Sequence, residues 1–199
     1  MKSVVARRAA VLVPIVFVEE RPGSPHLLFT KRSLHLNNHK GHVSFPGGRC
    51  EPGETAVQTA LRETTEEIAL SSDAVQVPGE LDDLLSINGE IVTPVVGHVT
   101  LPLSLHTFRE TVDFETRFRP LMPSKAEVSD IMLIPISKLV DPAYIAFEDL
   151  GYRAKNVPVF QAGRHRVWGL TSFITRTFLQ AVELWPAGAE LVVSSQKQN

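Results

Sequence analysis

The chain has 199 residues, of which 43% are hydrophobic, and its formal net charge is −2. This length suits one domain with a substantial core and is short for two, so we treat residues 1–199 as a single domain. The nearly balanced charge argues against nucleic acid as a partner, and the single cysteine, Cys50, excludes an internal disulfide and fits a reducing compartment.

The N-terminal ten residues carry Lys2, Arg7 and Arg8, and no acidic residue precedes Glu19. This composition is a feature of organelle-targeting segments. Residues 9–18 are apolar but far too few to span a bilayer, so we interpret them as the first buried strand. We therefore expect an intracellular protein without a membrane span, mitochondrial or cytoplasmic.

The next elements lead to a glycine turn and a helix. Residues 19–25 contain two prolines and a glycine and predict a loop. A strand is expected at 26–32, and a polar loop at 33–42 separates it from a short extended segment at 43–45. Breaker residues then precede a helix expected from 55 to about 70.

The second half of the chain alternates strand and helix signals. An Asn-Gly pair between two apolar runs is a strong hairpin signal. The predicted elements are a hairpin of 80–87 and 90–101, a strand at 130–135, a short helix at 136–140, a hairpin at 151–163, a short strand at 166–168 and a closing helix at 170–185. Strands around one early and one late helix predict an α/β fold with a mixed sheet between helices.

The helix expected after the glycine turn has an acidic face. At about 100° per residue, Glu63, Glu66 and Glu67 share one sector, and the apolar face opposite comprises Val57, Leu61, Thr64 and Ile68. Like charges at i,i+4 weaken a helix, and a divalent cation would offset this because Mg²⁺ prefers oxygen ligands. The alternative is a solvated face on which Arg62 pairs with Glu66.

The spacing of these residues resembles the Nudix box, G-x5-E-x7-R-E-U-x-E-E-x-G-U, where U is a bulky aliphatic residue. The matching residues are Gly48, Glu54, Arg62, Glu63, Glu66, Glu67 and Leu70. Thr64 replaces an aliphatic residue, and Ala69 stands where the family has glycine. Thr64 keeps a methyl group, whereas Ala69 would strain the helix exit if that residue is left-handed. The resemblance implies a Nudix-fold α/β/α sandwich.

The stretch before the box resembles the coenzyme A diphosphatase signature L-L-T-x-R-S-x3-R-x3-G-x3-F-P-G-G. The matches are Leu28, Thr30, Arg32, Ser33, Gly41, Phe45, Pro46, Gly47 and Gly48, and the departures are Phe29 and Asn37. Segments 92–96, 126–130 and 166–171 look like the same branch, and the last two resemble the animal mitochondrial-type enzymes. The resemblance extends over roughly residues 9–179.

By this resemblance, the protein would hydrolyse the diphosphate bond of coenzyme A or acyl-CoA, giving 3′,5′-ADP and (acyl-)4′-phosphopantetheine, with Mg²⁺ or Mn²⁺. The metal ligands would be Glu63, Glu66, Glu67 and the backbone carbonyl of Gly47. Arg62 would orient the glutamates, and Glu54 would support the turn. The general base would be Glu63 or Glu127.

The candidate substrate-binding residues are Arg32, Ser33, His39, Lys40 and Gly41. Arg32, His39 and Lys40 would meet the 3′-phosphate; alternatively, Arg32 pairs with a helix carboxylate and the other two are solvated loop residues. We expect Trp168 in the core rather than at a substrate platform.

Two other functions stay open at this point. One is a Nudix hydrolase of another nucleoside diphosphate derivative, such as ADP-ribose, NADH or a capped RNA end. The other is a Nudix-fold module that binds a nucleotide without cleaving it, although such a role needs no metal cluster. The residues do not decide between a monomer and a homodimer.

Overall fold

The computed structural model describes residues 7–19, 21–35, 40–101, 103, 121–149 and 155–187. Its strands are β1 (Arg8–Val18), β2 (Arg21–Arg32), β3 (Val43–Ser44), β4 (Gly47–Arg49), β5 (Val75–Glu80), β6 (Leu84–Leu85), β7 (Ile91–Val99), β8 (Val128–Pro135), β9 (Ile145–Glu148) and β10 (Val157–Phe160). Its helices are α1 (Ala56–Ile68), α2 (Ile136–Leu139) and α3 (Leu170–Ala181), with 3₁₀ turns at Ser72–Ala74 and Pro142–Tyr144.

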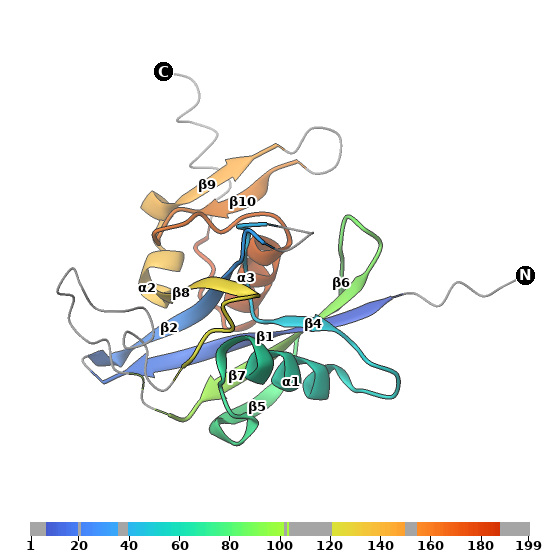
Figure 1. The fold of residues 1–199 in the computed structure, drawn as a ribbon. Coiled ribbons are helices and arrows are strands. Elements are labelled where there is room, and N and C mark those ends of the chain that lie inside the picture. Colours follow the sequence, from blue (N-terminus) through green and yellow to red (C-terminus); the bar gives the residue numbers. More distant parts are fainter. Residues whose placement is uncertain are drawn as a thin grey trace, which may run out of the picture.

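Strand β1 is the centre of a mixed sheet (Figure 1). Along one edge it pairs in parallel with β7. Along the other edge its first half pairs with β4 and its second half with β2, both antiparallel. Strand β2 continues beyond β1 and pairs with β3 and β8. This divergence of β2 from β1 leaves room for the glycine turn of β4 directly beside β1.

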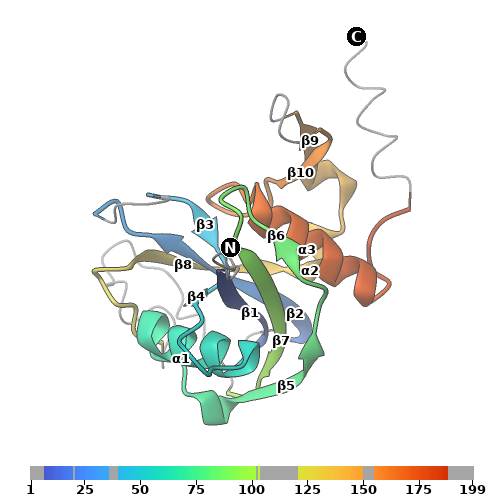
Figure 2. The ribbon, with the colours of Figure 1, turned by 90° about the vertical axis from the view of Figure 1, so that its right-hand side faces the viewer.

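Helices cover both faces of this sheet, as Figure 2 shows with α1 and α3 on opposite sides. Alternate side chains of β1 point to opposite faces because the side-chain period of a strand is two. The core on the α1 side includes Ala10, Leu12, Val16, Leu28, Ala60 and Ile68. The core on the α3 side includes Ala9, Val13, Leu27, Phe29, Ile174, Phe178 and Leu179. The predicted α/β/α sandwich with a mixed sheet is therefore confirmed.

Strand β2 begins at Arg21, so the loop predicted at residues 19–25 is wrong from residue 21 onward. The register explains why prolines and a glycine occur in this strand. Val18 pairs with Arg21, but the preceding Phe17 pairs with Pro25, and the extra residues of β2 form an irregularity in the ladder. A bulge of this kind tolerates residues that cannot join a regular ladder.

The predicted hairpin at Asn88–Gly89 is present, with Leu85 opposite Ile91 and Gly89 at φ +77°. Its first strand is not continuous, because the run predicted at 80–87 is divided between β5 and β6, which pair with different parts of β7. The short strand and helix predicted at 130–140 are confirmed as β8 and α2.

The elements after α2 differ in their bounds from the prediction. The hairpin predicted at 151–163 starts earlier, at β9, and the strand predicted at 166–168 is only an isolated bridge from Val167 to Phe160. Helix α3 ends at Ala181 instead of residue 185. Glu183 has φ +58°, and the amides of Leu184 and Trp185 both donate to the carbonyl of Leu179, so a left-handed residue ends this helix before Pro186.

Helix α1 starts at a capping box and ends at the residue where the Nudix box has glycine. Thr55 Oγ1 accepts from the amide of Gln58, and the Gln58 side chain accepts from the amide of Thr55. At the other end, Ala69 is left-handed, with φ 56° and ψ 27°. The left-handed helix exit anticipated for the glycine position is therefore confirmed, and this chain meets it with alanine.

Replacing Ala69 with glycine should stabilise the protein. Left-handed backbone costs alanine roughly 1 kcal/mol or more, and the greater freedom of glycine in the unfolded chain offsets part of that gain. We expect Ala69→Gly to raise the free energy of unfolding by about 0.5 kcal/mol, measured by urea denaturation. Ala181→Gly, in the last turn of α3, is the control and should lower it. Equal losses in both variants would contradict strain at Ala69.

Candidate active site

The glycine turn of β4 lies between β1 and helix α1, and two glycines allow this approach. Gly47 has φ +151°, and a Cβ atom at this residue would overlap the carbonyl oxygen of Ala10 and lie 2.5 Å from Cα of Val11. A Cβ atom at Gly48 would instead overlap the carboxylate of Glu63. The first glycine therefore lets β4 pair with β1, and the second lets Glu63 reach the turn.

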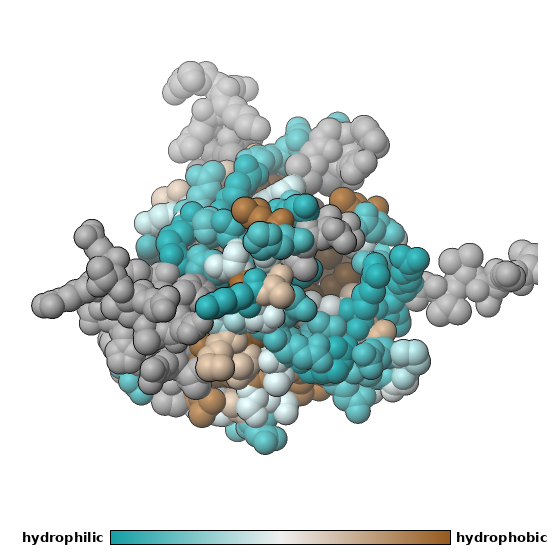
Figure 3. Space-filling view, in the orientation of Figure 1, coloured by the Kyte–Doolittle hydropathy of each residue, from teal (hydrophilic) through white to brown (hydrophobic). Residues whose placement is uncertain are grey.

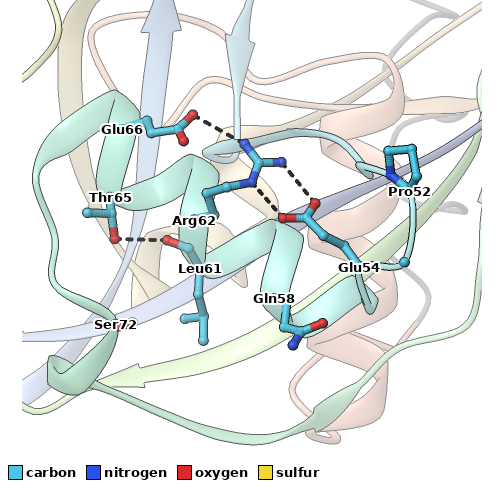
Figure 4. A pocket seen from close by; sticks show the side chains of 9 residues that line it. Pro52, Glu54, Gln58, Leu61, Arg62, Thr65, Glu66 and Ser72 are labelled. Carbon is cyan, nitrogen blue, oxygen red and sulfur yellow. Dashed lines mark hydrogen bonds and ion pairs between the residues drawn. The ribbon is translucent and has the colours of Figure 1, made fainter.

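Arg62 holds three carboxylates of the box. Its Nε donates to Glu54 Oε1 at 2.7 Å, and its Nη2 donates to Glu54 Oε2 at 3.0 Å and to the carbonyl of Arg49 at 3.2 Å. Its Nη1 donates to Glu63 at 3.1 Å and to Glu66 at 3.2 Å. Figure 4 shows the guanidinium of Arg62 between Glu54 and Glu66. The Arg62–Glu66 pair anticipated for a solvated acidic face is therefore present, and the same guanidinium also bonds to Glu54 and Glu63.

Glu54 is the best-satisfied carboxylate of the site. Hydrogen bonds from Arg62, the amide of Glu51 and the hydroxyl of Thr59 lower the pKa of Glu54 to about 2. It is therefore ionised throughout the physiological range and joins the turn to the helix. Thr59 is buried and donates to Glu54 at 2.8 Å, a contact that box spacing does not reveal.

Glu67 is the buried member of the acidic face, with 3% of its surface exposed. Desolvation raises the pKa of Glu67 to about 8, although Arg32, whose Nη1 is 3.6 Å from Oε1, acts in the opposite direction. Among the described residues, Glu67 Oε2 and Arg32 Nε are buried polar atoms without a hydrogen-bond partner. Each member of this ion pair therefore has one buried atom that could form a further hydrogen bond.

Glu63 and Glu66 are progressively more exposed than Glu67. Desolvation raises the pKa of Glu63, and the hydrogen bond from Arg62 opposes the shift. Glu66 is exposed to solvent. The predicted buried face of α1 is right at Thr64 and Ile68, which are buried, but Val57 and Leu61 are only partly buried. The buried surface extends instead to Ala60 and Glu67. The correction arises because β4 packs against α1 and covers the flank that carries Glu67.

The atoms predicted to bind the metal are of the chemical type that a hard divalent cation prefers. Three carboxylates and a backbone carbonyl supply only oxygen, and Glu67 has a buried oxygen without a partner. Within the described ranges, however, no three Asp, Glu, His or Cys side chains form a ready metal cluster. Arg62 Nη1 donates hydrogen bonds to both Glu63 and Glu66 there, so these two carboxylates are engaged by a cation of the chain itself.

A groove of about 680 Å³ follows the other flank of α1. Its lining includes Pro52, Glu54, Gln58, Leu61, Arg62 and Glu66 (Figure 4). Glu63 and Glu67 do not line it. The groove therefore exposes the back of the arginine network, on a different side of the helix from the buried glutamate.

Comparison with known proteins fits this geometry. Residues 6–155 match the model of the NUDIX domain. The chain belongs to the Nudix family. It is 38% identical over 174 residues to the mouse mitochondrial coenzyme A diphosphatase NUDT8, covering 86% of this chain and 76% of the mouse protein. Human NUDT8 is 39% identical over 177 residues, covering 86% and 68% of the two chains.

A bacterial relative supports the same family, and a solved structure shares the fold. The uncharacterised Nudix hydrolase NudL of Photorhabdus laumondii is 35% identical over 181 residues, covering 89% of this chain and 86% of that protein. The crystal structure of a MutT/nudix family protein from Enterococcus faecalis has a TM-score of 0.52 at 12% identity, covering 89% of this chain and 62% of that one. At this identity, the likeness concerns the fold alone. The chain is thus a Nudix hydrolase, an enzyme acting on diphosphate bonds.

The candidate substrate residues of this Nudix hydrolase occupy different environments. The guanidinium of Arg32 faces Glu67, as one of the two sequence alternatives anticipated. Ser33 is buried, and its hydroxyl accepts from the amide of His35. Gly41, at φ +67°, donates its amide to the carbonyl of Arg32 and closes the loop. Lys40 is exposed, and His39 lies outside the described residues.

Glu127 and Trp168 lie at the same end of the sheet as Arg32. The amide of Ser33 donates to the carbonyl of Glu127 at 2.7 Å, and the charge of Glu127 contributes to the raised pKa of both Glu63 and Glu67. Glu127 is thus an exposed carboxylate close to the box. Trp168 is only half-buried and belongs to neither core cluster, so its predicted place in the core is wrong.

Glu67 should make the stability of the metal-free enzyme depend on pH. Its pKa rises from 4.5 in the unfolded chain to about 8 in the folded protein. Between these values the folded protein keeps a proton that the unfolded chain has released. The stability from this group is therefore complete below pH 4.5 and is lost as the pH rises through 8.

In the Glu67→Gln variant this side chain is neutral at every pH, so the loss of stability with rising pH should disappear. We expect it to raise the free energy of unfolding at pH 8 by a few kcal/mol, and by much less at pH 5. Urea denaturation in the presence of EDTA at both pH values measures the two differences. A gap between wild type and variant that is the same at pH 5 and pH 8 would show that Glu67 is not the group responsible.

In the described part of the chain, none of the helices has the length and apolar character to cross a membrane.

Proposed function

We propose that this Nudix hydrolase cleaves the diphosphate bond of coenzyme A or acyl-CoA, giving 3′,5′-ADP and (acyl-)4′-phosphopantetheine. The observation that carries the proposal is the contact of Arg32 with Glu67. It joins the stretch resembling the coenzyme A signature to the helix that carries the box. The similarity to two mammalian proteins named mitochondrial coenzyme A diphosphatase supports the same substrate and makes mitochondria the first compartment to test.

In this proposal the chain supplies positioning and charge. Glu63, Glu66, Glu67 and the carbonyl of Gly47 would hold Mg²⁺ or Mn²⁺. When bound, the cation would neutralise charge that develops on the phosphate oxygens and lower the pKa of the attacking water. Arg62 keeps the carboxylates in place through the bonds described above, and Glu54 anchors Arg62.

Two residues are candidates for the general base. Glu63 already accepts a hydrogen bond from Arg62 and touches the glycine turn, which suits it to a fixed position at the phosphate. Glu127 is exposed at the rim of the site, which suits it to exchange protons with solvent. We propose that one of them takes the proton from water. Comparing the pH profiles of kcat for Glu63→Gln and Glu127→Gln assigns the role, because loss of the base removes the acidic limb.

Product analysis tests the function directly. The enzyme is incubated with coenzyme A, acetyl-CoA, NADH and ADP-ribose in the presence of Mg²⁺ or Mn²⁺, and the products are separated. We expect 3′,5′-ADP from the first two and no turnover with EDTA. Only coenzyme A compounds yield adenosine carrying two separate phosphates. Faster cleavage of ADP-ribose would assign the enzyme to another substrate class, and nucleotide binding without turnover would indicate a non-catalytic module.

A further inference from the structure

A second group of charged side chains lies at the end of β2, on the opposite face of the sheet from the box. Lys31 and Asp130 are register partners in β2 and β8. Arg164 and His165 come from the loop between β10 and α3. Arg164 Nη2 lies 2.8 Å from each carboxylate oxygen of Asp130, and His165 Nε2 lies 3.4 Å from both Lys31 Nζ and Asp130 Oδ2. We call these four residues the Lys31 cluster.

The Lys31 cluster has more positive than negative charge. Lys31 and Arg164 face one carboxylate, so one positive charge is in excess even with His165 neutral. His165 cannot satisfy both neighbours either, because its Nε2 accepts from Lys31 or donates to Asp130 but not both at once. An anion beside Lys31 and His165 would balance the charge. Lys31 could then donate to the anion, and His165 Nε2 could donate its proton to Asp130.

Arg164 and His165 of the Lys31 cluster are accessible to solvent, whereas the carboxylate of Asp130 is largely covered. The side chain of Asp130 is 12% exposed, compared with 48% for Arg164 and 33% for His165. In the described part of the chain, Arg164 uses only its Nη2, on Asp130 and the carbonyl of Ile131. Asp130 fixes the guanidinium of Arg164 at the surface, with its other N–H groups available. This arrangement suits a ligand with several acceptor oxygens.

The Lys31 cluster is linked through Arg32 to the helix that carries the box. Lys31 precedes Arg32, whose guanidinium contacts Glu67 on the other face. Ser129 donates to the carbonyls of both Lys31 and Arg32, which ties this end of β2 to β8. Figure 3 shows the surface hollowed above α1, with hydrophobic atoms in the hollow. Because Arg32 already faces Glu67, a second phosphate of the substrate needs other cations.

We propose that Lys31, Arg164 and His165 form a subsite for the phosphate monoester of the substrate, the 3′-phosphate of the adenosine moiety. This inference rests on the proposed function and deepens it, because NADH and ADP-ribose lack such a group. Arg164 and His165 also lie beyond residues 6–155, the part that matches the family model. The subsite would therefore give this chain a selectivity that the box does not supply. Asp130 is a positioning residue that holds Arg164.

Kinetics with a matched pair of substrates test the subsite. The kcat/KM of wild type for coenzyme A should exceed that for 3′-dephospho-coenzyme A by about tenfold or more. Arg164→Gln and Lys31→Gln should each raise KM for coenzyme A about tenfold and leave kcat/KM for the dephospho compound unchanged, and Arg164→Lys should restore part of the loss. Arg166→Gln is the control, because Arg166 lies in the same loop as Arg164 but pairs with Glu148 instead of Asp130.

The outcomes separate this inference from the proposed function. If wild type and Arg164→Gln cleave both substrates equally well, the subsite is wrong and the proposed function stands. Equal losses on both substrates would mean a merely structural role and would also overturn the subsite. If wild type cleaves neither compound, the proposed function is wrong, and calorimetric binding decides the subsite: 3′,5′-ADP should bind about tenfold more tightly than 5′-AMP, and Arg164→Gln should abolish that difference.

Discussion

Glu67→Gln should lower kcat for coenzyme A by roughly a thousandfold while the protein stays folded. Glutamine keeps the size of the side chain but cannot supply the negative charge that a divalent cation requires. Because the same change removes a buried carboxylate, the variant should be at least as stable as wild type in the absence of metal. Loss of activity together with undiminished stability is thus the expected signature of a residue placed for function.

The control for this variant is Glu51→Gln, the same chemical change at an exposed residue of the turn. It should retain wild-type kcat. Isothermal titration with Mn²⁺ gives a second measurement, in which Glu67→Gln should bind the cation at least tenfold more weakly than Glu51→Gln. Near-normal turnover by Glu67→Gln would disprove the proposed metal ligand.

Gly47→Ala should prevent stable folding, because the new methyl group meets backbone atoms of β1. It would overlap the carbonyl oxygen of Ala10 and lie 2.5 Å from Cα of Val11, and neither atom can move without breaking the pairing of β4 with β1. Overpacking and strained backbone together give an expected loss of about 4 kcal/mol or more in the free energy of unfolding. Thermal denaturation by circular dichroism measures it.

The neighbouring Gly48→Ala should separate fold from activity. Its methyl group meets the carboxylate of Glu63, a side chain that can turn away, so we expect a small loss of stability and a loss of kcat of about a hundredfold. Gly53→Ala is the control for both variants. Its φ is +88° but nothing lies within 4 Å of the added atom, so it should cost only about 1–2 kcal/mol of backbone strain. Similar losses of stability in all three variants would contradict this distinction.

Local patterns predicted those features that depend on residues close in the chain. The periodicity of the box predicted helix α1, and the family pattern anticipated a left-handed exit at Ala69, because both reflect backbone geometry over a few residues. The presence of Thr64 where the box has an aliphatic residue is also explained locally, because Thr64 is buried and its hydroxyl donates to the carbonyl of Ala60. Strand bounds were less predictable, because pairing irregularities such as that in β2 depend on the partner strand.

By itself, the sequence determined the fold class, the helix that carries the box and the set of box residues, since their spacing along one helix brings them together. Only the tertiary structure decided how these residues differ. Packing of β4 against α1 buries Glu67 and leaves Glu66 in solvent, and the end of β2 brings Arg32 to Glu67. The Lys31 cluster joins Lys31 to His165 across 134 residues of chain, a separation at which no spacing pattern indicates contact. Burial and such long-range contacts arise from the docking of whole elements.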